Sequence, residues 1–316
     1  MIRVTLLAGG VGGAKMAEGF AALDNVDLTV IGNVADDEEF HGLWVSPDID
    51  TMLYTLSGRI NRDQGWGLAD EGRRALDMLG DLGAETWMFL GDRDFGLHIW
   101  RTERLRRGDS ASEITRDIAQ AFGVKPRILL PTDDRVQTRV KVAEGWLTFQ
   151  EYFVRHQCKP EVEALRIEGL TDARPTQSAL AALAEADLIV IAPSNPLVSI
   201  APILGITGIT ENLTRAAAPV YAVSPLIAGR VVKGPADRMM QALGLRADAV
   251  GLAEGYRGVA DVMVIDTADQ THVSEIETLG MQAQVTDIMM PDSAGKARLA
   301  GELVTAFQSA WQETAA

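Results

Sequence analysis

Short apolar runs recur along the chain, and each of them ends in small or polar residues. The first run, Ile2–Leu7, leads at once into the glycine-rich stretch AGGVGGAK, then into a helical pattern at 14–23 and a second run at 26–32. A strand, a loop, a helix and a second strand in this order are typical of a parallel sheet. The rhythm returns in DLIVIAPSNP, APVYAVSP, DVMVID and AQVTD. The pattern predicts an α/β fold with a Rossmann-like, doubly wound, mostly parallel sheet.

One segment departs from this rhythm. Between Arg127 and Ile167, the runs RILLP, TRVKVAEGWLTFQEYF and LRIEG favour short strands, with a hairpin turn at Glu144–Gly145. We therefore predict a small β-rich insertion at 127–167 within one Rossmann-like domain formed by residues 1–126 and 168–316. A further strand of the sheet is predicted at 85–90 (ETWMFL).

Charge and cysteine content narrow the classes of function. The formal net charge of −15 argues against binding nucleic acid or anionic membranes through the general field of the protein. Cys158 is the only cysteine, so an internal disulfide and a cysteine-based metal cluster are both excluded. The first residues read as a strand and a loop, not as a signal peptide, and no apolar run is long enough to span a membrane. We expect a cytoplasmic protein.

The glycine loop fits neither of the two familiar phosphate-binding patterns. Gly10-x-Gly12 begins a dinucleotide pattern, but Lys15 stands where the third glycine belongs, and the residues beside Lys15 are not those of a P-loop. Glycines still let several backbone N–H groups face an anion at a helix N-terminus. We therefore expect contact with a phosphate or nucleotide, the alternative being a tight strand-to-helix turn. The candidate residues are Gly9, Gly10, Gly12 and Gly13.

Two aspartates in SPDIDTMLY are the candidate metal ligands. Asp48 lies at a helix start and Asp50 in its first turn, but only one of them is needed as a cap. Paired carboxylates at the edge of a parallel sheet suit Mg²⁺, which binds one or two carboxylates together with substrate phosphates. Asp36 and Asp37, in the loop GNVADD, are expected to form a solvated loop face.

Other polar stretches also follow predicted strands and should meet the glycine loop at one sheet edge. Arg93 in GDRD and the Arg230–Lys233 loop offer cations for phosphates, and the prolines of PSNP would fix Ser194 and Asn195 against a ligand. His98, on a predicted helix, is expected to be a packed or exposed histidine and not a catalyst. The absence of a nucleophile triad, HExxH or CxxC favours phosphoryl chemistry, in which positioning and charge stabilisation dominate.

Taken in order, these stretches resemble the CofD family, the 2-phospho-L-lactate transferases of coenzyme F-420 biosynthesis. The resemblance rests on AGGVGGAK, GNVADD, SPDIDTMLYTLSG, GDRDFGLHIWRTERLRRG, FQEYFVR, IAPSNPLVSIAPIL, VSPLIAG and KGPADRMM. It covers nearly the whole chain, and SPDxDTxLYTL and APSNPxxSIxPIL are specific phrases.

The resemblance implies a magnesium-dependent transferase of the 2-phospho-L-lactate transferase type. The donor would be a guanosine diphosphate conjugate of a small phosphorylated acid: phospholactate, phosphoenolpyruvate or phosphoglycerate. The acceptor would be Fo, a deazaflavin whose terminal ribityl hydroxyl attacks the phosphorus while GMP leaves. Family knowledge implies that Asp50 and Arg93 lie near the deazaflavin and that Asp48 and Asp50 hold the metal. Asp50 could also orient the attacking hydroxyl, whether or not it acts as a general base.

The remaining polar residues are then candidates for the guanine nucleotide. They are the glycine loop, Asn33, Ser194, Asn195, Arg230 and Lys233. The alternative function is a nucleotide-sugar-binding regulatory protein on a related fold, because uridine-sugar-binding proteins share the GGxGG start. An NAD-dependent oxidoreductase is disfavoured by Asn33, which stands where an acid would bind the ribose. The expected partners are small molecules and a second copy of the chain.

Overall fold

The central sheet of the computed structural model, which describes residues 1–315, has seven strands that all run parallel. Their spatial order is β14-β13-β10-β9-β1-β2-β5. The strands are β1 (Ile2–Ala8), β2 (Val26–Gly32), β5 (Arg127–Leu129), β9 (Leu188–Ile191), β10 (Val220–Val223), β13 (Val262–Asp266) and β14 (Gln282–Thr286). Every residue of β9, β10 and β13 is buried, as expected for strands that helices cover on both sides. The predicted Rossmann-like α/β class is confirmed.

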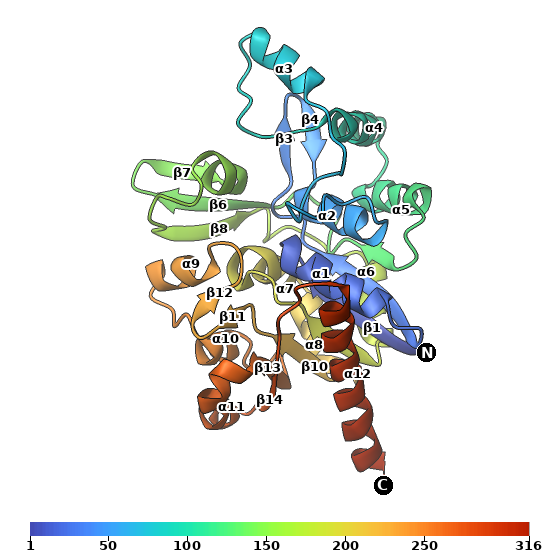
Figure 1. Ribbon diagram of the computed structural model, residues 1–316, viewed down its shortest axis with the longest axis vertical. Coiled ribbons are helices and arrows are strands. Elements are labelled where there is room, and N and C mark those ends of the chain that lie inside the picture. Colours follow the sequence, from blue (N-terminus) through green and yellow to red (C-terminus); the bar gives the residue numbers. More distant parts are fainter. Residues whose placement is uncertain (316) are drawn as a thin grey trace.

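Strand order decides where the helices lie. From β1 the chain moves to β2 on one side, whereas from β9 it moves to β10 and then β13 on the other side. Because such crossovers are right-handed, α1 (Gly10–Ala21) must cover one face, and α8 (Ile209–Arg215), α10 (Ala249–Gly255) and α11 (Val273–Thr278) must cover the opposite face. The last helix, α12 (Ser293–Ala315), and α2 (Pro47–Leu56) pack beside α1 (Figure 1).

The same strand order creates a crevice. The chain leaves β1 and β9, which are neighbours, in opposite directions, so the loops at their carboxyl ends separate. These loops hold the glycine stretch after Ala8 and the PSNP stretch after Ala192. In doubly wound sheets, ligands bind at this kind of switch point.

A separate module stands above the carboxyl edge of the sheet (top of Figure 1). It contains the hairpin of β3 (Glu38–Phe40) and β4 (Leu43–Val45), with α3 (Arg74–Asp81) and α4 (Asp92–Arg107). Its small core includes Phe40, Leu76, Leu90 and Phe95. The strand predicted at 85–90 is wrong, because this segment is irregular and its apolar side chains pack against the module core instead of a sheet.

The predicted insertion contains a three-stranded antiparallel sheet in the order β7-β6-β8. Its strands are β6 (Gln137–Val142), β7 (Gly145–Thr148) and β8 (Ala164–Glu168). The predicted hairpin is present, but its turn residues are Ala143 and Glu144, and Gly145 already pairs with Val142. Two further details differ from the expectation. Arg127–Leu129 pairs with β2 in the central sheet, since α5 (Ala111–Phe122) completes a parallel crossover, and Glu151–Arg155 is a π-helical turn, η1, not a strand.

The remaining elements are short and connect the strands. They are α6 (Gln177–Glu185), η2 (Pro196–Ile200), α7 (Ala201–Gly205), β11 (Leu226–Ile227), β12 (Arg230–Val231), α9 (Ala236–Ala242) and η3 (Thr267–His272). Within residues 1–315, no single helix is long and apolar enough to cross a bilayer; one bent pair, Pro196–Gly205 with Ile209–Arg215, meets the length and composition test.

Candidate functional site

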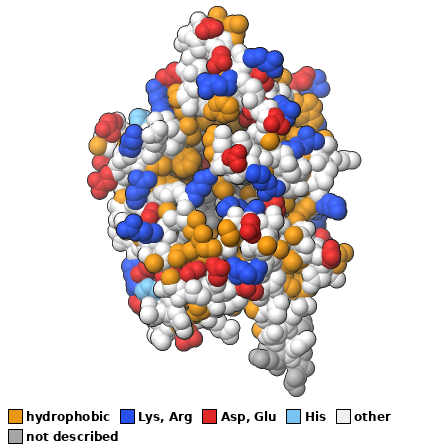
Figure 2. All heavy atoms as spheres, in the orientation of Figure 1, with side chains coloured by type: hydrophobic (Ala, Val, Ile, Leu, Met, Phe, Trp, Pro, Cys, Tyr) orange, Lys and Arg blue, Asp and Glu red, His pale blue; other side chains and the backbone are white. Residues whose placement is uncertain are grey.

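A cavity of 510 Å³ lies at the switch point, between the sheet edge, the upper module and the insertion. Figure 2 shows the corresponding hollow in the middle of the face, with hydrophobic side chains deep inside it. Its polar lining includes Gly9, Gly10, Gly12, Lys15, Ser194, Asn195 and Lys233. Its acidic and imidazole lining consists of Asp36, Asp48, Asp50, Asp94 and His98. Its apolar lining includes Val45, Tyr54, Trp66, Met88, Phe89, Leu90, Phe149 and Phe153.

The glycine loop forms the floor of the cavity because its backbone approaches two other loops closely. Gly10 has a φ of 60°, a value that side chains disfavour, and it opens α1 directly behind β1. A Cβ at Gly12 would lie 2.2 Å from the carbonyl oxygen of Pro193. The loop therefore brings the N-terminus of α1, with its free N–H groups, against the PSNP stretch. Gly13 lies under this turn and is absent from the cavity lining.

Ser194 and Asn33 hold the floor together from behind. The Ser194 hydroxyl donates to the Gly9 carbonyl at 2.7 Å and accepts from the Gly9 N–H at 3.2 Å. Asn33, fully buried at the end of β2, donates from Nδ2 to Asp48 Oδ2 at 3.0 Å and to the Val198 carbonyl at 3.2 Å. Asn33 thus orients a cavity residue without itself lining the cavity.

Asn195 is positioned in the same way. Its Oδ1 accepts from the N–H of Leu197 at 2.9 Å and so caps η2. Its amide nitrogen lies 3.7 Å from Met239 Sδ, a weak acceptor. The side chain is therefore fixed on the cavity wall, where its N–H group remains available to a ligand.

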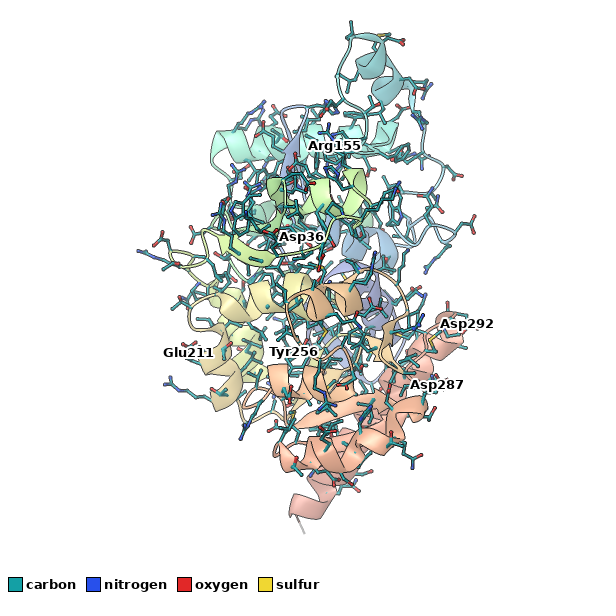
Figure 3. The ribbon with its side chains drawn as sticks, turned by 90° about the vertical axis from the view of Figure 1, so that its left-hand side faces the viewer. Asp36, Arg155, Glu211, Tyr256, Asp287 and Asp292 are labelled. Carbon is teal, nitrogen blue, oxygen red and sulfur yellow. The ribbon has the colours of Figure 1, made fainter. Side chains whose placement is uncertain are left out.

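Asp36, which is buried, and Asp48, which is partly exposed, form an acidic pair on the cavity wall, and Figure 3 shows Asp36 near the middle of the molecule. Burial raises the pKa of Asp48 to about 6, although hydrogen bonds from Asn33 and the Gly10 backbone lower it. Burial, and then the charge of Asp48, raise the pKa of Asp36 well above its usual range. Asp36 Oδ1 has no hydrogen-bond partner of good geometry. The pair has the oxygen ligands and the uncompensated charge that would accept a divalent cation.

The expectation of a solvated face at Asp36 and Asp37 is wrong, because both side chains are buried. Asp37 Oδ2 accepts from the Ser46 hydroxyl at 2.7 Å and from Trp44 Nε1 at 3.2 Å, and burial raises the pKa of Asp37 to about 8. Position was the signal in the sequence: GNVADD follows β2, the strand next to the glycine loop.

Asp50 occupies a different environment from Asp48. Both of its carboxylate oxygens accept from the Arg101 guanidinium, one of them from Nη1 at 3.0 Å, and both side chains are almost fully buried. This bidentate pairing compensates the charge of Asp50. No group of three or more His, Cys, Asp or Glu side chains suited to a metal occurs in the described part of the chain. Asp36 and Asp48 therefore fit a metal better than Asp50 does, and the ligand role of Asp50 stays a prediction.

The predicted cations divide into two groups. Lys233 lines the cavity and donates to the Gln64 carbonyl at 2.9 Å. Arg93 and Arg230 are exposed and lie outside the lining residues; Arg93 donates instead to the Ala69 carbonyl at 3.1 Å. Their substrate contacts stay predictions.

Lys15 was missed as a cavity residue. It lines the cavity, and its ammonium group donates to the Met290 carbonyl at 3.2 Å. Burial, followed by the charges of Lys296 and Lys233, lowers the pKa of Lys15. The lysine that closes GGVGGAK was the available signal: it sits one turn into α1, beside the floor.

Similarity to known proteins was found over almost the whole chain. A family model described as 2-phospho-L-lactate transferase CofD matches residues 4–302. A phosphoenolpyruvate transferase of Streptomyces coelicolor is 39% identical over 311 residues, which cover 96% of this chain and 98% of the relative. A 2-phospho-L-lactate transferase of Methanopyrus kandleri is also 39% identical, over 307 residues that cover 96% and 97%.

Solved structures resemble the fold. Two crystal structures of a Bacillus halodurans protein of the upf0052 family superpose with TM-scores of 0.63 and 0.62, at 16% and 15% identity. Each match covers 96% of this chain and 99% of the other. At this identity the likeness concerns the architecture alone.

Proposed function

The chain belongs to the 2-phospho-L-lactate transferase CofD family, and from this premise we propose its reaction. It transfers a phospholactyl-type group from a guanosine diphosphate-linked donor to the terminal ribityl hydroxyl of the deazaflavin Fo. GMP is released, and the product is a phosphodiester intermediate of coenzyme F-420 biosynthesis.

The observation that carries this proposal is the combination of two chemistries in one cavity. Its floor offers helix N–H groups, Asn195, Lys15 and Lys233, which suit phosphates. Its upper wall is aromatic and apolar, which suits a flat ring. The proposed transferase must bind the ring of the alcohol and the diphosphate of the donor at the same time. It therefore needs both surfaces in one cavity.

In the proposed reaction, the hydroxyl oxygen of Fo forms a bond to the phosphorus that bears the small acid. The bond from that phosphorus to the oxygen of GMP breaks, and the hydroxyl proton passes to a carboxylate or to water. Lys15 and Lys233 would bind the phosphoryl oxygens and stabilise the negative charge that develops on the leaving group. The glycine floor would orient the diphosphate by its N–H groups, and Asp50, held rigidly by Arg101, would orient the attacking hydroxyl.

We further propose that the acidic pair of Asp36 and Asp48 holds Mg²⁺. The fit rests on two adjacent carboxylates, an unpartnered oxygen of Asp36 and pKa values that burial raises in both residues. Bound there, Mg²⁺ would supply charge neutralisation at the phosphates. Asn33 would keep the Asp48 oxygens aimed at the metal, in the manner of an outer-shell hydrogen bond.

The decisive experiment combines purified protein with Fo, Mg²⁺ and each of three guanosine diphosphate conjugates in turn. The conjugates carry phospholactate, phosphoenolpyruvate or phosphoglycerate, since the relatives bear the names of two of these acids. Mass spectrometry should detect one deazaflavin phosphodiester together with an equal amount of GMP. If no conjugate yields either product, the transferase proposal is wrong, and the acid transferred fastest identifies the natural donor.

A further inference from the structure

Two side chains of α4 face the cavity and have no role in the proposed transfer. Asp94 and His98 are four residues apart, so they lie about 6 Å from each other on one face of the helix. Both are buried, at 7% and 2% exposure, and both line the cavity. The sequence pattern had indicated only a packed or exposed histidine at position 98. Asp94 also closes the capping box of α4, but a carboxylate and an imidazole on one cavity face can in addition bind a ligand that offers both a donor and an acceptor.

Arg101 determines which nitrogen of His98 carries the proton. Its Nη1 lies 3.1 Å from His98 Nδ1, and a guanidinium can only donate, so Nδ1 must accept. Burial lowers the pKa of His98 to about 4, so the ring is neutral and its single N–H is on Nε2. No hydrogen bond to Nε2 exists among the described residues. His98 thus presents one fixed, neutral donor to the cavity.

Asp94 is the matching acceptor. The Tyr54 hydroxyl donates to its Oδ1 at 2.7 Å, and the Gly91 N–H lies 3.5 Å from its Oδ2. A carboxylate has about four acceptor positions, so at least one remains for a ligand. The Asp50 carboxylate lies 3.9 Å from His98 Nδ1, and the same cavity is also lined by the apolar side chains of Val45, Met88, Phe89 and Leu90. A donor and an acceptor fixed side by side on one cavity wall discriminate between ligands by the pattern of hydrogen bonds that each ligand offers.

We propose that Asp94 and His98 recognise the N–H and C=O edge of the pyrimidinedione ring of the acceptor. Asp94 accepts from the ring N–H, and His98 Nε2 donates to the adjacent ring carbonyl oxygen. This inference rests on the proposed function, because it assigns the ring of Fo to the part of the cavity wall that carries Asp94 and His98, which we call the α4 wall. Guanine shares the N–H and C=O pattern but adds an exocyclic amine. Each oxygen of Asp94 already accepts one hydrogen bond and can accept another, so the titrations below, with Fo and with GDP, distinguish the two rings.

Two substitutions separate ligand recognition from support of Arg101. In His98→Asn, the amide oxygen stands as far from the backbone as Nδ1 and can still accept from Arg101, but the Nε2 donor is lost. In His98→Gln, the amide nitrogen stands where Nε2 was and can still donate to the cavity. If His98 binds the ligand, the Gln variant should bind Fo more tightly than the Asn variant. If His98 only supports Arg101, the Asn variant should bind Fo more tightly.

The experiment titrates Fo, without donor or metal, against the full-length protein and follows the quenching of Fo fluorescence. We expect His98→Asn to weaken Fo binding at least tenfold and His98→Gln to stay within threefold of the wild type, with GDP affinity unchanged in both. Equal Fo binding by the two variants, or a better Asn variant, would overturn the inference. If the variants lose GDP affinity instead of Fo affinity, the α4 wall binds guanine, and this result would also overturn the inference.

A second measurement uses only the wild-type protein and so avoids any effect on folding. An Fo analogue methylated at the ring nitrogen cannot donate to Asp94 and should bind at least tenfold more weakly than Fo. Equal binding of the two ligands would refute the contact while leaving the proposed reaction intact. If the folded wild type binds neither ligand, the proposed function falls, and this inference falls with it.

Discussion

The floor and the α4 wall of the cavity are built in opposite ways. The floor consists of backbone and short polar side chains from the loops that follow β1 and β9, two neighbouring strands of the sheet, together with Lys15 of α1 and Lys233 after β12. The wall consists of charged and aromatic side chains that reach each other across α2 and α4, as in the pair of Asp50 with Arg101. A floor of this kind binds phosphates with little selectivity, because backbone N–H groups respond only to the charge and shape of the anion. A wall of fixed donors and acceptors selects a ring whose hydrogen-bonding edge matches them.

The largest effect is expected at the acidic pair beside the floor. Asp48→Asn removes a charge that the proposed metal requires, so kcat/KM should fall about a thousand-fold. Asp37→Asn is the control: Asp37 is a buried acid of the same loop as Asp36 but does not line the cavity, and its raised pKa makes a neutral side chain acceptable. Initial rates of GMP release with varied Mg²⁺ check this. Comparable rates in the two variants would refute the proposed metal site.

The next effect tests whether the floor depends on close backbone approach. Gly12→Ala places a Cβ against the Pro193 carbonyl, so α1 must move, at a cost of about 1–3 kcal/mol in stability. We expect GDP affinity to fall about thirtyfold, or about 2 kcal/mol. Gly96→Ala, where a Cβ meets nothing and φ is not positive, is the control and should leave GDP affinity unchanged. Calorimetric titration with GDP compares the two variants. Unchanged GDP affinity in Gly12→Ala would mean that the glycine loop is only a strand-to-helix turn and does not bind phosphate.

A smaller effect separates the cations of the floor from those outside it. Lys15→Met should weaken donor binding about tenfold, because it removes one charge-assisted hydrogen bond. Arg230→Ala should leave donor binding unchanged, since Arg230 is exposed on β12 and absent from the lining. KM values for the donor test both. A larger rise of the donor KM in Arg230→Ala than in Lys15→Met would support the predicted role of Arg230 in donor binding. It would also show that Lys15 is not part of the site.

The two regions also differ in how well a sequence predicts them. The floor follows from local rules: a strand that ends in glycines, and a parallel sheet whose order brings Ala8, Gly32 and Ile191 to one edge. The α4 wall depends on pairs such as Tyr54 with Asp94 and Asp50 with Arg101, forty and fifty-one residues apart in the chain. No periodicity or motif encodes such pairings.

The errors have the same origin. The segment 85–90 has the composition of a strand, but it packs onto the core of the upper module, which only tertiary structure reveals. Asp36 and Asp37 look like solvated acids because most acids are exposed. Their burial follows from the β3–β4 hairpin and the insertion sheet folding over the loop, where Gln137 Nε2 donates to the Asp37 carbonyl at 2.9 Å and Gln150 Nε2 donates to the Asp36 carbonyl at 3.1 Å.

The smallest effect concerns pH and isolates the wall from the floor. Burial, followed by the charges of Asp50 and Glu71, raises the pKa of Asp94 to about 6, while hydrogen bonds from Tyr54 and Gly91 lower it. Only the ionised carboxylate accepts freely from a ring N–H, so Fo binding should weaken as the pH falls through 6. At one pH unit below the pKa the loss approaches about tenfold, because only about one carboxyl in ten is then ionised.

His98 cannot cause this loss, because its lowered pKa of about 4 keeps it neutral throughout the range. Asp48 also titrates near pH 6, but it lies beside the floor, so Asp48→Asn should keep the pH profile of Fo binding measured without metal. Asp94→Asn should instead bind Fo weakly and independently of pH between 5 and 7. If Asp48→Asn removes the pH dependence of Fo binding and Asp94→Asn does not, the deazaflavin ring binds at the floor and not at the α4 wall. The ligands assigned to the two regions would then have to be exchanged.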